Sequence, residues 1–237
     1  MLESLPSSLS DIEEDELLKW INEELANERG VFAKGYQGKV LLFMHRNERL
    51  VIKAPPSKGL LGGFYKSMVR HEYEIYRRLK TLDGVPKCYG LLDNQYLVLS
   101  FIDGGSLRER EPEDRALFFN RLLKLLHDMH SLGVAHFDLK RKDNILVADN
   151  DVPYLIDFGL AVTKKPRPYI HLLNRYLFSQ ARRFDFNAWV KHKYKKDYRQ
   201  VSDEDRRYLD RSLTETVSHT VKVIYRYFKK KKWRLER

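Results

Sequence analysis

The sequence has little cysteine and no long hydrophobic run. Cys88 is the single cysteine among 237 residues, so an intramolecular disulfide is excluded and a reducing compartment is expected. The longest apolar stretch, Tyr96 to Ile102, is interrupted by Ser100 and is far shorter than the ~20 residues that span a bilayer. The first ten residues lead into an acidic segment and not into the apolar core of a signal peptide. These absences predict a soluble cytoplasmic protein.

Basic residues are scarce at one end of the chain, and acidic residues are scarce at the other. Residues 1–30 carry nine acidic and two basic side chains, whereas residues 160–237 carry 22 basic and eight acidic ones. An excess of cations predicts an anionic partner for the C-terminal part, such as nucleic acid, an acidic membrane surface or a phosphorylated acceptor. A solvated basic helix explains the same excess equally well.

The pattern of apolar residues divides the chain into three parts. Residues 1–30 are an acidic helical extension, in which Ser10 and Glu13 form a capping box for a helix that ends near Ala26. Residues 31–102 are rich in strands and include one helix, and residues 103–237 are mainly helical. The expected elements are strands at 40–43, 50–52, 96–101, 145–147 and 154–156, and helices at 65–79, 113–132, 171–196 and 203–232.

The strand-rich part contains the first candidate site residues. Gly35 and Gly38 precede Val40 at the start of a strand, where residues without a Cβ let the backbone approach phosphate groups. Lys53 ends the next apolar strand, and a lysine at that position needs a carboxylate to hold it in place. Glu72 on the following helix is the candidate, and Glu74 is the weaker choice because it lies about 200° round the helix.

The helical part contains a second group. His136-Phe137-Asp138-Leu139-Lys140 follows a helix that Gly133 ends, and Asn144-Ile145-Leu146 and Asp157-Phe158-Gly159 come next. Phosphoryl transfer needs a carboxylate to orient and deprotonate the acceptor hydroxyl, and oxygen ligands for Mg²⁺. Asp138 suits the first role, and Asn144 and Asp157 suit the second. Lys140 is placed to neutralise charge on the transferred phosphoryl group.

The two groups, taken in this order, resemble the protein-kinase superfamily over about residues 31–160. The resemblance implies an α+β, bilobal protein-kinase-like fold, with an antiparallel-sheet N-lobe over 31–102 and a mostly helical, minimal C-lobe over 103–237. It implies an ATP- and Mg²⁺-dependent phosphotransferase. The nucleotide is then held between the lobes by Gly35, Gly38, Val40, Lys53 and Glu72.

Three departures from the family pattern matter. Phe137 stands where H-R-D kinases have an arginine that pairs with a phosphate on the activation loop, so control by such a phosphate is not expected. Asn144 lies six residues after Asp138 and not five, which predicts a local bulge over 141–143 and leaves Asp143 as an alternative metal ligand. No A-P-E follows D-F-G, which predicts a reduced platform for peptide substrates.

A compact chain with these departures is similar to bacterial lipopolysaccharide-core kinases of the Kdo/heptose type and, next, to small RIO-like atypical kinases. The first resemblance implies a glycolipid sugar as acceptor at the inner face of the membrane, where the basic tail 229–234 would contact anionic lipid. A solvated helix end explains that tail equally well.

Two alternative functions stay open. Lys140, two residues after Asp138, is shared by serine/threonine protein kinases, which favours a protein hydroxyl as acceptor. A pseudokinase or binding module for an anionic partner is the alternative of another class, and nucleic acid is the partner least expected.

Overall fold

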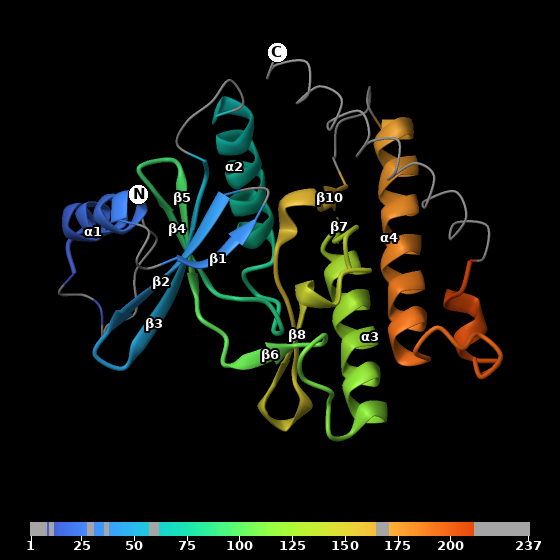
Figure 1. Ribbon diagram of the computed structural model, residues 1–237. Helices are drawn as coiled ribbons and strands as arrows, with labels where there is room; N and C mark the ends of the chain where they lie inside the picture. The colour runs from blue at the N-terminus through green and yellow to red at the C-terminus, as the bar shows by residue number, and fades with distance from the viewer. Residues whose placement is uncertain are drawn as a thin grey trace, which may run out of the picture.

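The fold has two parts, which lie side by side in Figure 1. The structure is a computed structural model that describes residues 9, 12–27, 31–35, 38–56, 62–164 and 171–210. An antiparallel sheet with two helices forms the first part, and helices with small sheets form the second. The predicted α+β class, with its antiparallel N-terminal sheet, is confirmed.

The sheet of the first part has the strand order β1-β2-β3-β5-β4. Its strands are β1 (Val31–Gly35), β2 (Gly38–His45), β3 (Glu48–Ala54), β4 (Cys88–Leu92) and β5 (Tyr96–Ser100). Each neighbouring pair is antiparallel. Helix α1 (Glu14–Asn27) precedes the sheet, and α2 (Gly62–Arg78) lies between β3 and β4 in sequence.

Side chains of β3 alternate between the two faces of this sheet. Leu50 and Ile52 pack with Leu17 and Ile21 of α1, whereas Val51 packs against the core that includes α2. Because successive side chains of a strand point to opposite faces, the side chain that follows Ile52 is directed to the α2 face. Helices α1 and α2 thus cover opposite faces of the sheet (Figure 1), and the sheet presents Lys53 to α2.

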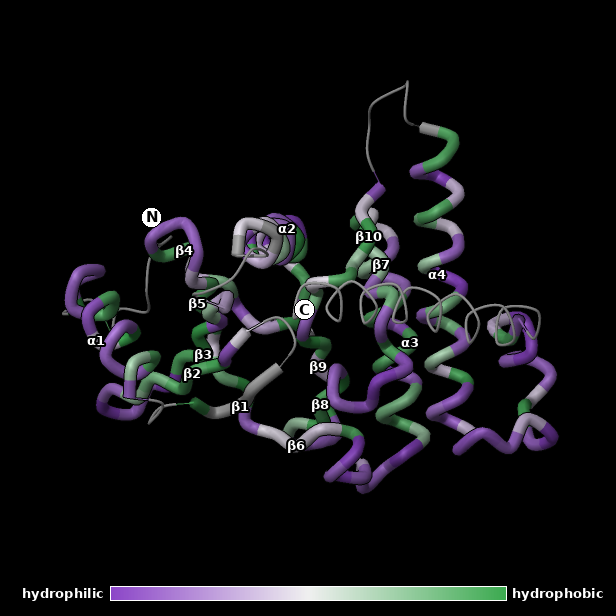
Figure 2. Tube along the Cα trace, turned by 45° about the horizontal axis from the view of Figure 1, so that its top comes forward, coloured by the Kyte–Doolittle hydropathy of each residue, from purple (hydrophilic) through white to green (hydrophobic). Residues whose placement is uncertain are grey.

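The second part is built on α3 (Arg115–Ser131) and α4 (His171–Lys193), which pack together. Trp189 of α4 donates its indole N–H to the carbonyl oxygen of Phe119 in α3 at 2.7 Å. One hydrophobic core continues from Ile75 of α2 through Phe118 of α3 to Trp189. In Figure 2 the hydrophobic colour is found along β2, β3, β8 and β9, while α1 is drawn mostly in the hydrophilic colour.

Short strands connect the helices of the second part. They pair as β6-β8-β9 and as β10-β7. Their bounds are β6 (Gly104–Ser106), β7 (Val134–Ala135), β8 (Ile145–Ala148), β9 (Pro153–Leu155) and β10 (Val162–Thr163). The strands expected at 145–147 and 154–156 are therefore present as β8 and, one residue earlier, β9.

Helix ends agree best with the sequence where a capping residue fixes them. Asp114 caps α3 by accepting from the backbone N–H of Leu117 at 2.9 Å, and Gly133 follows the helix with φ of +73°. This positive φ favours glycine, which ends the helix as expected. The range expected for this helix, 113–132, differs from the observed range of α3 by two residues at its start and one at its end.

Other expected bounds were wrong. Helix α1 begins at Glu14, four residues after the expected cap. Gly62 and Gly63 belong to α2, which begins three residues before the expected start at 65, and Gly104 and Gly105 belong to β6, which was not expected and pairs with β8. Pairing with a distant strand overrides the local turn preference of the glycine pair. In the helix expected over 203–232, Asp205–Tyr208 is a short 3₁₀ turn, and 211–232 lies outside the described residues.

The packing of α1 on the sheet gives a test of stability. Leu17 and Ile21 are fully buried, so Leu17→Ala or Ile21→Ala should each lower the free energy of unfolding by about 2–5 kcal/mol. The exposed Lys19 supplies the control, because Lys19→Ala should change it by less than about 0.5 kcal/mol. Urea denaturation measures both, and equal values for the three variants would show that α1 does not pack as described.

Candidate active site

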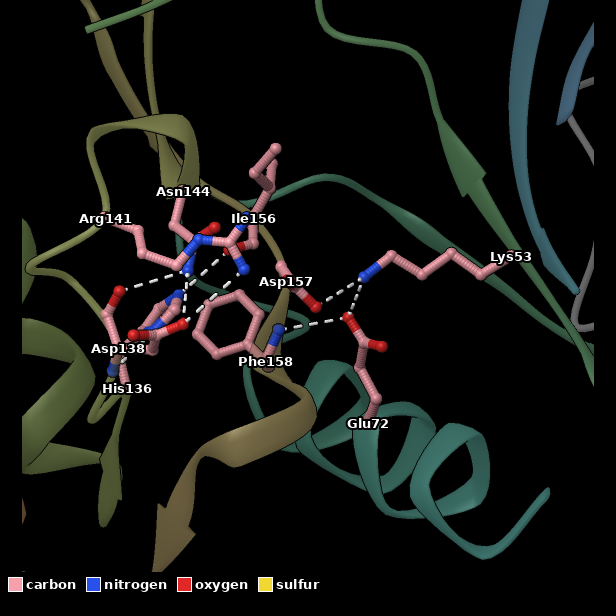
Figure 3. Close-up of polar contacts among 9 residues, drawn as sticks. All are labelled: Lys53, Glu72, His136, Asp138, Arg141, Asn144, Ile156, Asp157 and Phe158. Carbon is pink, nitrogen blue, oxygen red and sulfur yellow. Dashed lines mark hydrogen bonds and ion pairs between the residues drawn. The ribbon is translucent and has the colours of Figure 1, made fainter. Parts of the chain in front are cut away.

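Lys53 connects three segments that are far apart in the sequence (Figure 3). Its Nζ lies 2.6 Å from Glu72 Oε1 in α2 and 3.1 Å from Asp157 Oδ1, which follows β9. Glu72 Oε1 also accepts from the backbone N–H of Phe158 at 3.0 Å. The expected partner of Lys53 is thus confirmed, and Glu74, the weaker candidate, instead faces Arg77 on the surface.

These contacts favour the charged forms of Lys53 and Asp157. Burial alone would lower the pKa of Lys53, but the nearby carboxylates of Glu72 and Asp157 outweigh it and raise that pKa. Burial would likewise raise the pKa of Asp157, but the ammonium group of Lys53 outweighs it and lowers that pKa. The pair thus exists as ammonium and carboxylate at neutral pH.

Asp138 and Asn144 meet at the other side of the site. Asn144 is buried and donates from Nδ2 to the backbone oxygen of Asp138 at 3.1 Å and to its Oδ2 at 3.4 Å. Burial raises the pKa of Asp138, while Arg141 and His136 act in the opposite direction. Lys140 is exposed and close enough to Asp138 to influence the same pKa.

The additional residue between Asp138 and Asn144 is accommodated in a 3₁₀ turn over Lys142–Asn144. Asp143 in this turn accepts two hydrogen bonds from Arg108, at 2.6 and 2.9 Å. Because Asp143 is bound there and Asn144 contacts Asp138, the geometry favours Asn144 over Asp143 as the residue beside the catalytic aspartate candidate.

The aromatic ring of Phe158 joins α2 to the H-x-D loop. Its centroid lies 5.1 Å from that of Tyr76 and 4.7 Å from that of His136. His136 Nε2 lies 2.9 Å from the backbone oxygen of Ile156, and its Nδ1 lies 3.4 Å from the N–H of Asp138. These partners assign the tautomer that carries its proton on Nε2.

Val40 and the two glycines lie on β1 and β2, and β2 is paired with β3, which carries Lys53. Val40 is paired with Lys53 across β2 and β3, so both side chains are on one face. Gly35 and Gly38 are paired across the β1–β2 hairpin, and the two residues between them lie outside the described residues. A Cβ at Gly38 would lie 2.0 Å from the backbone oxygen of Ala54, so close packing by itself requires a glycine there.

Asp157 and Asn144 have the donor set that Mg²⁺ prefers, namely a carboxylate and an amide oxygen. Asn144 commits its Nδ2 to Asp138, which leaves Oδ1 as its free ligand atom. Lys53, which contacts Asp157 at 3.1 Å, supplies a positive charge of the kind that phosphate oxygens bind. The residues present therefore fit a nucleoside triphosphate with its metal ion. Their catalytic roles stay predictions.

Comparison with known proteins identifies the family. A model of the protein kinase domain matches residues 28–177, which is more than half of the chain. The chain belongs to the protein kinase domain family. The enzyme class expected from the sequence, a phosphotransferase, is the class of this family.

The relatives of this kinase domain are larger proteins. It is 40% identical over 82 residues to serine/threonine-protein kinase D of Synechocystis sp., covering 32% of this chain and 16% of the relative. It is 27% identical over 158 residues to CDPK-related kinase 5 of Arabidopsis thaliana (60% and 26%) and 29% identical over 169 residues to the maternal embryonic leucine zipper kinase of Xenopus tropicalis (67% and 25%). The matches thus span about a quarter or less of each relative.

Sequence reasoning missed one acidic residue that contacts the site, Asp185 of α4. It is fully buried, and its two carboxylate oxygens accept from the backbone N–H groups of His136 and Phe137, both at 2.8 Å. His130 Nε2 lies 2.9 Å from the same side chain. Asp185 therefore fixes the backbone of the H-x-D loop. An acid on the buried face of an amphipathic helix, with Ala181 and Trp189 on the same face, is the signal that would have found it.

His192 of α4 makes a second contact with this loop. Its Nε2 lies 2.8 Å from the backbone oxygen of Leu139. Burial lowers the pKa of His192 to about 4, so the ring is neutral and donates this hydrogen bond from Nε2. Asp185 and His192 lie beyond residue 177, where the family match ends.

The ring of Phe137 is half-exposed and packs against Phe184 at 5.3 Å between centroids. Phe137 thus makes an apolar contact with α4 at the position where H-R-D kinases have an arginine.

Helix α2 also contacts the second part of the fold directly. Arg78 donates to the backbone oxygens of Leu132 at 2.7 Å and Lys164 at 3.1 Å. His71 Nε2 adds a contact with the backbone oxygen of Ala161 at 2.9 Å.

Within the part of the chain that the structure describes, no helix is both long and apolar enough to cross a membrane. The basic tail at 229–234, expected to contact anionic lipid or to be solvated, lies outside the described residues.

The neutral His192 predicts a pH dependence of stability. Its pKa is about 4 in the folded protein and 6.5 ordinarily, so between these values the unfolded chain binds more protons. The contribution is fully present above pH 6.5 and is lost as the pH falls to about 4, a difference of about 3 kcal/mol. His192→Gln keeps a donor for Leu139 but does not titrate.

Urea denaturation of both proteins at pH 7 and at pH 4.5 measures this difference. The wild type should lose more stability than His192→Gln over this interval. Parallel losses would mean that the imidazole is not buried in its neutral form.

Proposed function

We propose that this kinase domain transfers the γ-phosphoryl group of ATP, with Mg²⁺, to a serine or threonine hydroxyl of a protein. The observation that carries the proposal is the convergence of Lys53, Glu72 and Asp157 at 2.6 and 3.1 Å, with Asp138 and Asn144 in contact nearby. A pseudokinase would not need to keep each of these groups. This counts against the binding-module alternative.

Each residue has a defined role in this proposal. Lys53, positioned by Glu72, binds phosphate oxygens of the nucleotide. Three residues of the neighbouring hairpin line the nucleotide site: Gly35, Gly38 and Val40. Asp157 and Asn144 hold Mg²⁺, which when bound neutralises charge on the phosphates.

The acceptor hydroxyl is oriented by Asp138. Its carboxylate accepts the hydroxyl proton as the hydroxyl oxygen bonds to the γ-phosphorus and the bond from that phosphorus to the bridging oxygen breaks, with ADP as the leaving group. Burial in the site raises the pKa of Asp138 and so strengthens it as a base. Lys140 neutralises charge on the group in transfer. Asp185 keeps the backbone of this loop in place through the N–H groups of His136 and Phe137.

The protein acceptor is favoured over a lipopolysaccharide-core sugar. One of the relatives described above is named a serine/threonine-protein kinase, and the position of Lys140 after Asp138 agrees with that class. Among the described residues, no specific observation supports the glycolipid acceptor. Core glycolipid is therefore the second substrate in the test of the acceptor.

The test compares transfer of labelled phosphate from ATP to a mixture of protein substrates and to purified core glycolipid. Asp138→Asn should lower kcat for protein by about 10²–10⁴-fold, because the base is lost while the hydrogen bond from Asn144 can remain. Transfer to glycolipid but not to protein would contradict the proposed acceptor. Wild-type turnover in Asp138→Asn would contradict the role of Asp138.

The metal ligand is tested by two adjacent residues. Asn144→Ala should raise the Mg²⁺ concentration for half-maximal transfer by about tenfold or more, since one of two protein ligands is lost. Asp143→Ala removes partly exposed ion pairs with Arg108 and Arg141 and should leave that concentration nearly unchanged. The reverse result would assign the metal to Asp143.

A further inference from the structure

Four lysines lie beside the H-x-D loop and are called here the lysine cluster: Lys140, Lys142, Lys191 and Lys196. The hydrogen bond between His192 and the oxygen of Leu139 brings the end of α4 against this loop at 2.8 Å. The chain beyond α4 then turns back, because the N–H of Lys196 donates to the oxygen of Lys191 at 3.0 Å.

The ammonium groups are close enough to affect one another. Burial lowers the pKa of Lys191, and the positive charges of Lys196, Lys140 and Lys142 lower it further. Lys140 in turn acts on the pKa of Asp138. The cluster therefore begins at the proposed catalytic base and extends to the end of α4.

Among the described residues, no carboxylate forms an ion pair with any lysine of the cluster. The neighbouring cations are paired: Lys193 contacts Asp205 at 2.6 Å and Lys195 contacts Glu111 at 3.5 Å. Asp143, the acid nearest in sequence to Lys142, is bound by Arg108. Residues 191–196 thus contain two lysines with an ion pair, Lys193 and Lys195, between two lysines without one.

Such an arrangement costs stability in the free protein. Like charges repel, and Lys191 is half-buried, where an unpaired charge is less well solvated. A negatively charged ligand removes both costs. Close charge pairs at an interface contribute to affinity when they are partly desolvated.

We propose that the lysine cluster binds an anionic group of the acceptor protein, a phosphate or a carboxylate, next to the hydroxyl that receives the phosphoryl group. The proposal rests on the proposed function, since the hydroxyl is placed by Asp138. A peptide occupant is favoured because the cluster is compact and adjoins Asp138. A nucleic acid or membrane surface would instead be met by a wider basic face.

The experiment uses matched peptides with one serine acceptor. Their flanking residue is phosphoserine, aspartate or asparagine, placed at each neighbouring position in turn. The wild type should transfer phosphate to the best phosphoserine or aspartate peptide with a kcat/KM at least about tenfold above that for asparagine, equivalent to about 1.4 kcal/mol. The phosphoserine and aspartate arms separate a prior phosphorylation from an acidic sequence.

The test variant combines Lys142→Ala, Lys191→Ala and Lys196→Ala and leaves Lys140 in place. It should remove most of the tenfold preference through a higher KM for the anionic peptide, with kcat for the asparagine peptide unchanged. The control combines Lys19→Ala, Lys80→Ala and Lys124→Ala, which removes three exposed charges elsewhere and should keep the preference.

A binding measurement separates this inference from the proposed function. The labelled phosphoserine peptide is titrated by fluorescence anisotropy with Asp138→Asn protein, without ATP, in the presence and absence of the three cluster substitutions. Weaker binding with the substitutions supports the anion site even where no peptide is phosphorylated. Equal binding, or equal kcat/KM for all three wild-type peptides, overturns it. Tighter cluster-dependent binding to duplex DNA or to phosphatidylserine vesicles would also overturn the peptide occupant.

Discussion

The ion triad of Lys53, Glu72 and Asp157 is the interaction on which the rest of the site depends. Each of its members comes from a different segment: β3, α2 and the loop after β9. Two carboxylates offset the burial of one ammonium group, so the charges are stable only when all three segments are together. Correct placement of α2 and of Asp157 is therefore linked to the fold of the sheet.

A second constraint comes from α4, whose side chains bind the backbone of the H-x-D loop. Asp185 accepts from the backbone N–H groups of His136 and Phe137. His192 binds the backbone oxygen of Leu139 in the same loop. Because Phe137 packs on Phe184, this loop is held by apolar and backbone contacts. That no phosphate on the segment after D-F-G is needed to hold the loop stays a prediction from the replacement of the expected arginine by Phe137.

Much of the site could be predicted because its residues occur in short motifs whose chemistry is recognisable in one dimension. Lys53 with Glu72 and Asp138 with Asn144 belong to this group. The contact of Asp185 with the H-x-D loop and the packing of α1 on the sheet could not be predicted from such motifs. Both depend on which distant part of the chain a helix face packs against. The lysine cluster has the same origin: Lys140 and Lys191 are 51 positions apart in the sequence, and only the fold brings them together. Glycine pairs were one source of wrong bounds, because a helix start at Gly62 or strand pairing at Gly104 competes with a turn. The wrong bounds of α1 and of the helix expected over 203–232 lie away from such pairs.

The affinity for ATP with Mg²⁺, measured by isothermal titration calorimetry on Glu72→Gln and Glu74→Gln, tests the central role of the triad most directly. The two glutamates are on the same helix, but only Glu72 is buried against Lys53, whereas Glu74 lies near Arg77 on the surface. Glu72→Gln should weaken nucleotide binding by about tenfold or more, since Lys53 loses the carboxylate that positions it, and Glu74→Gln should not. Equal affinities in the two variants would contradict the account.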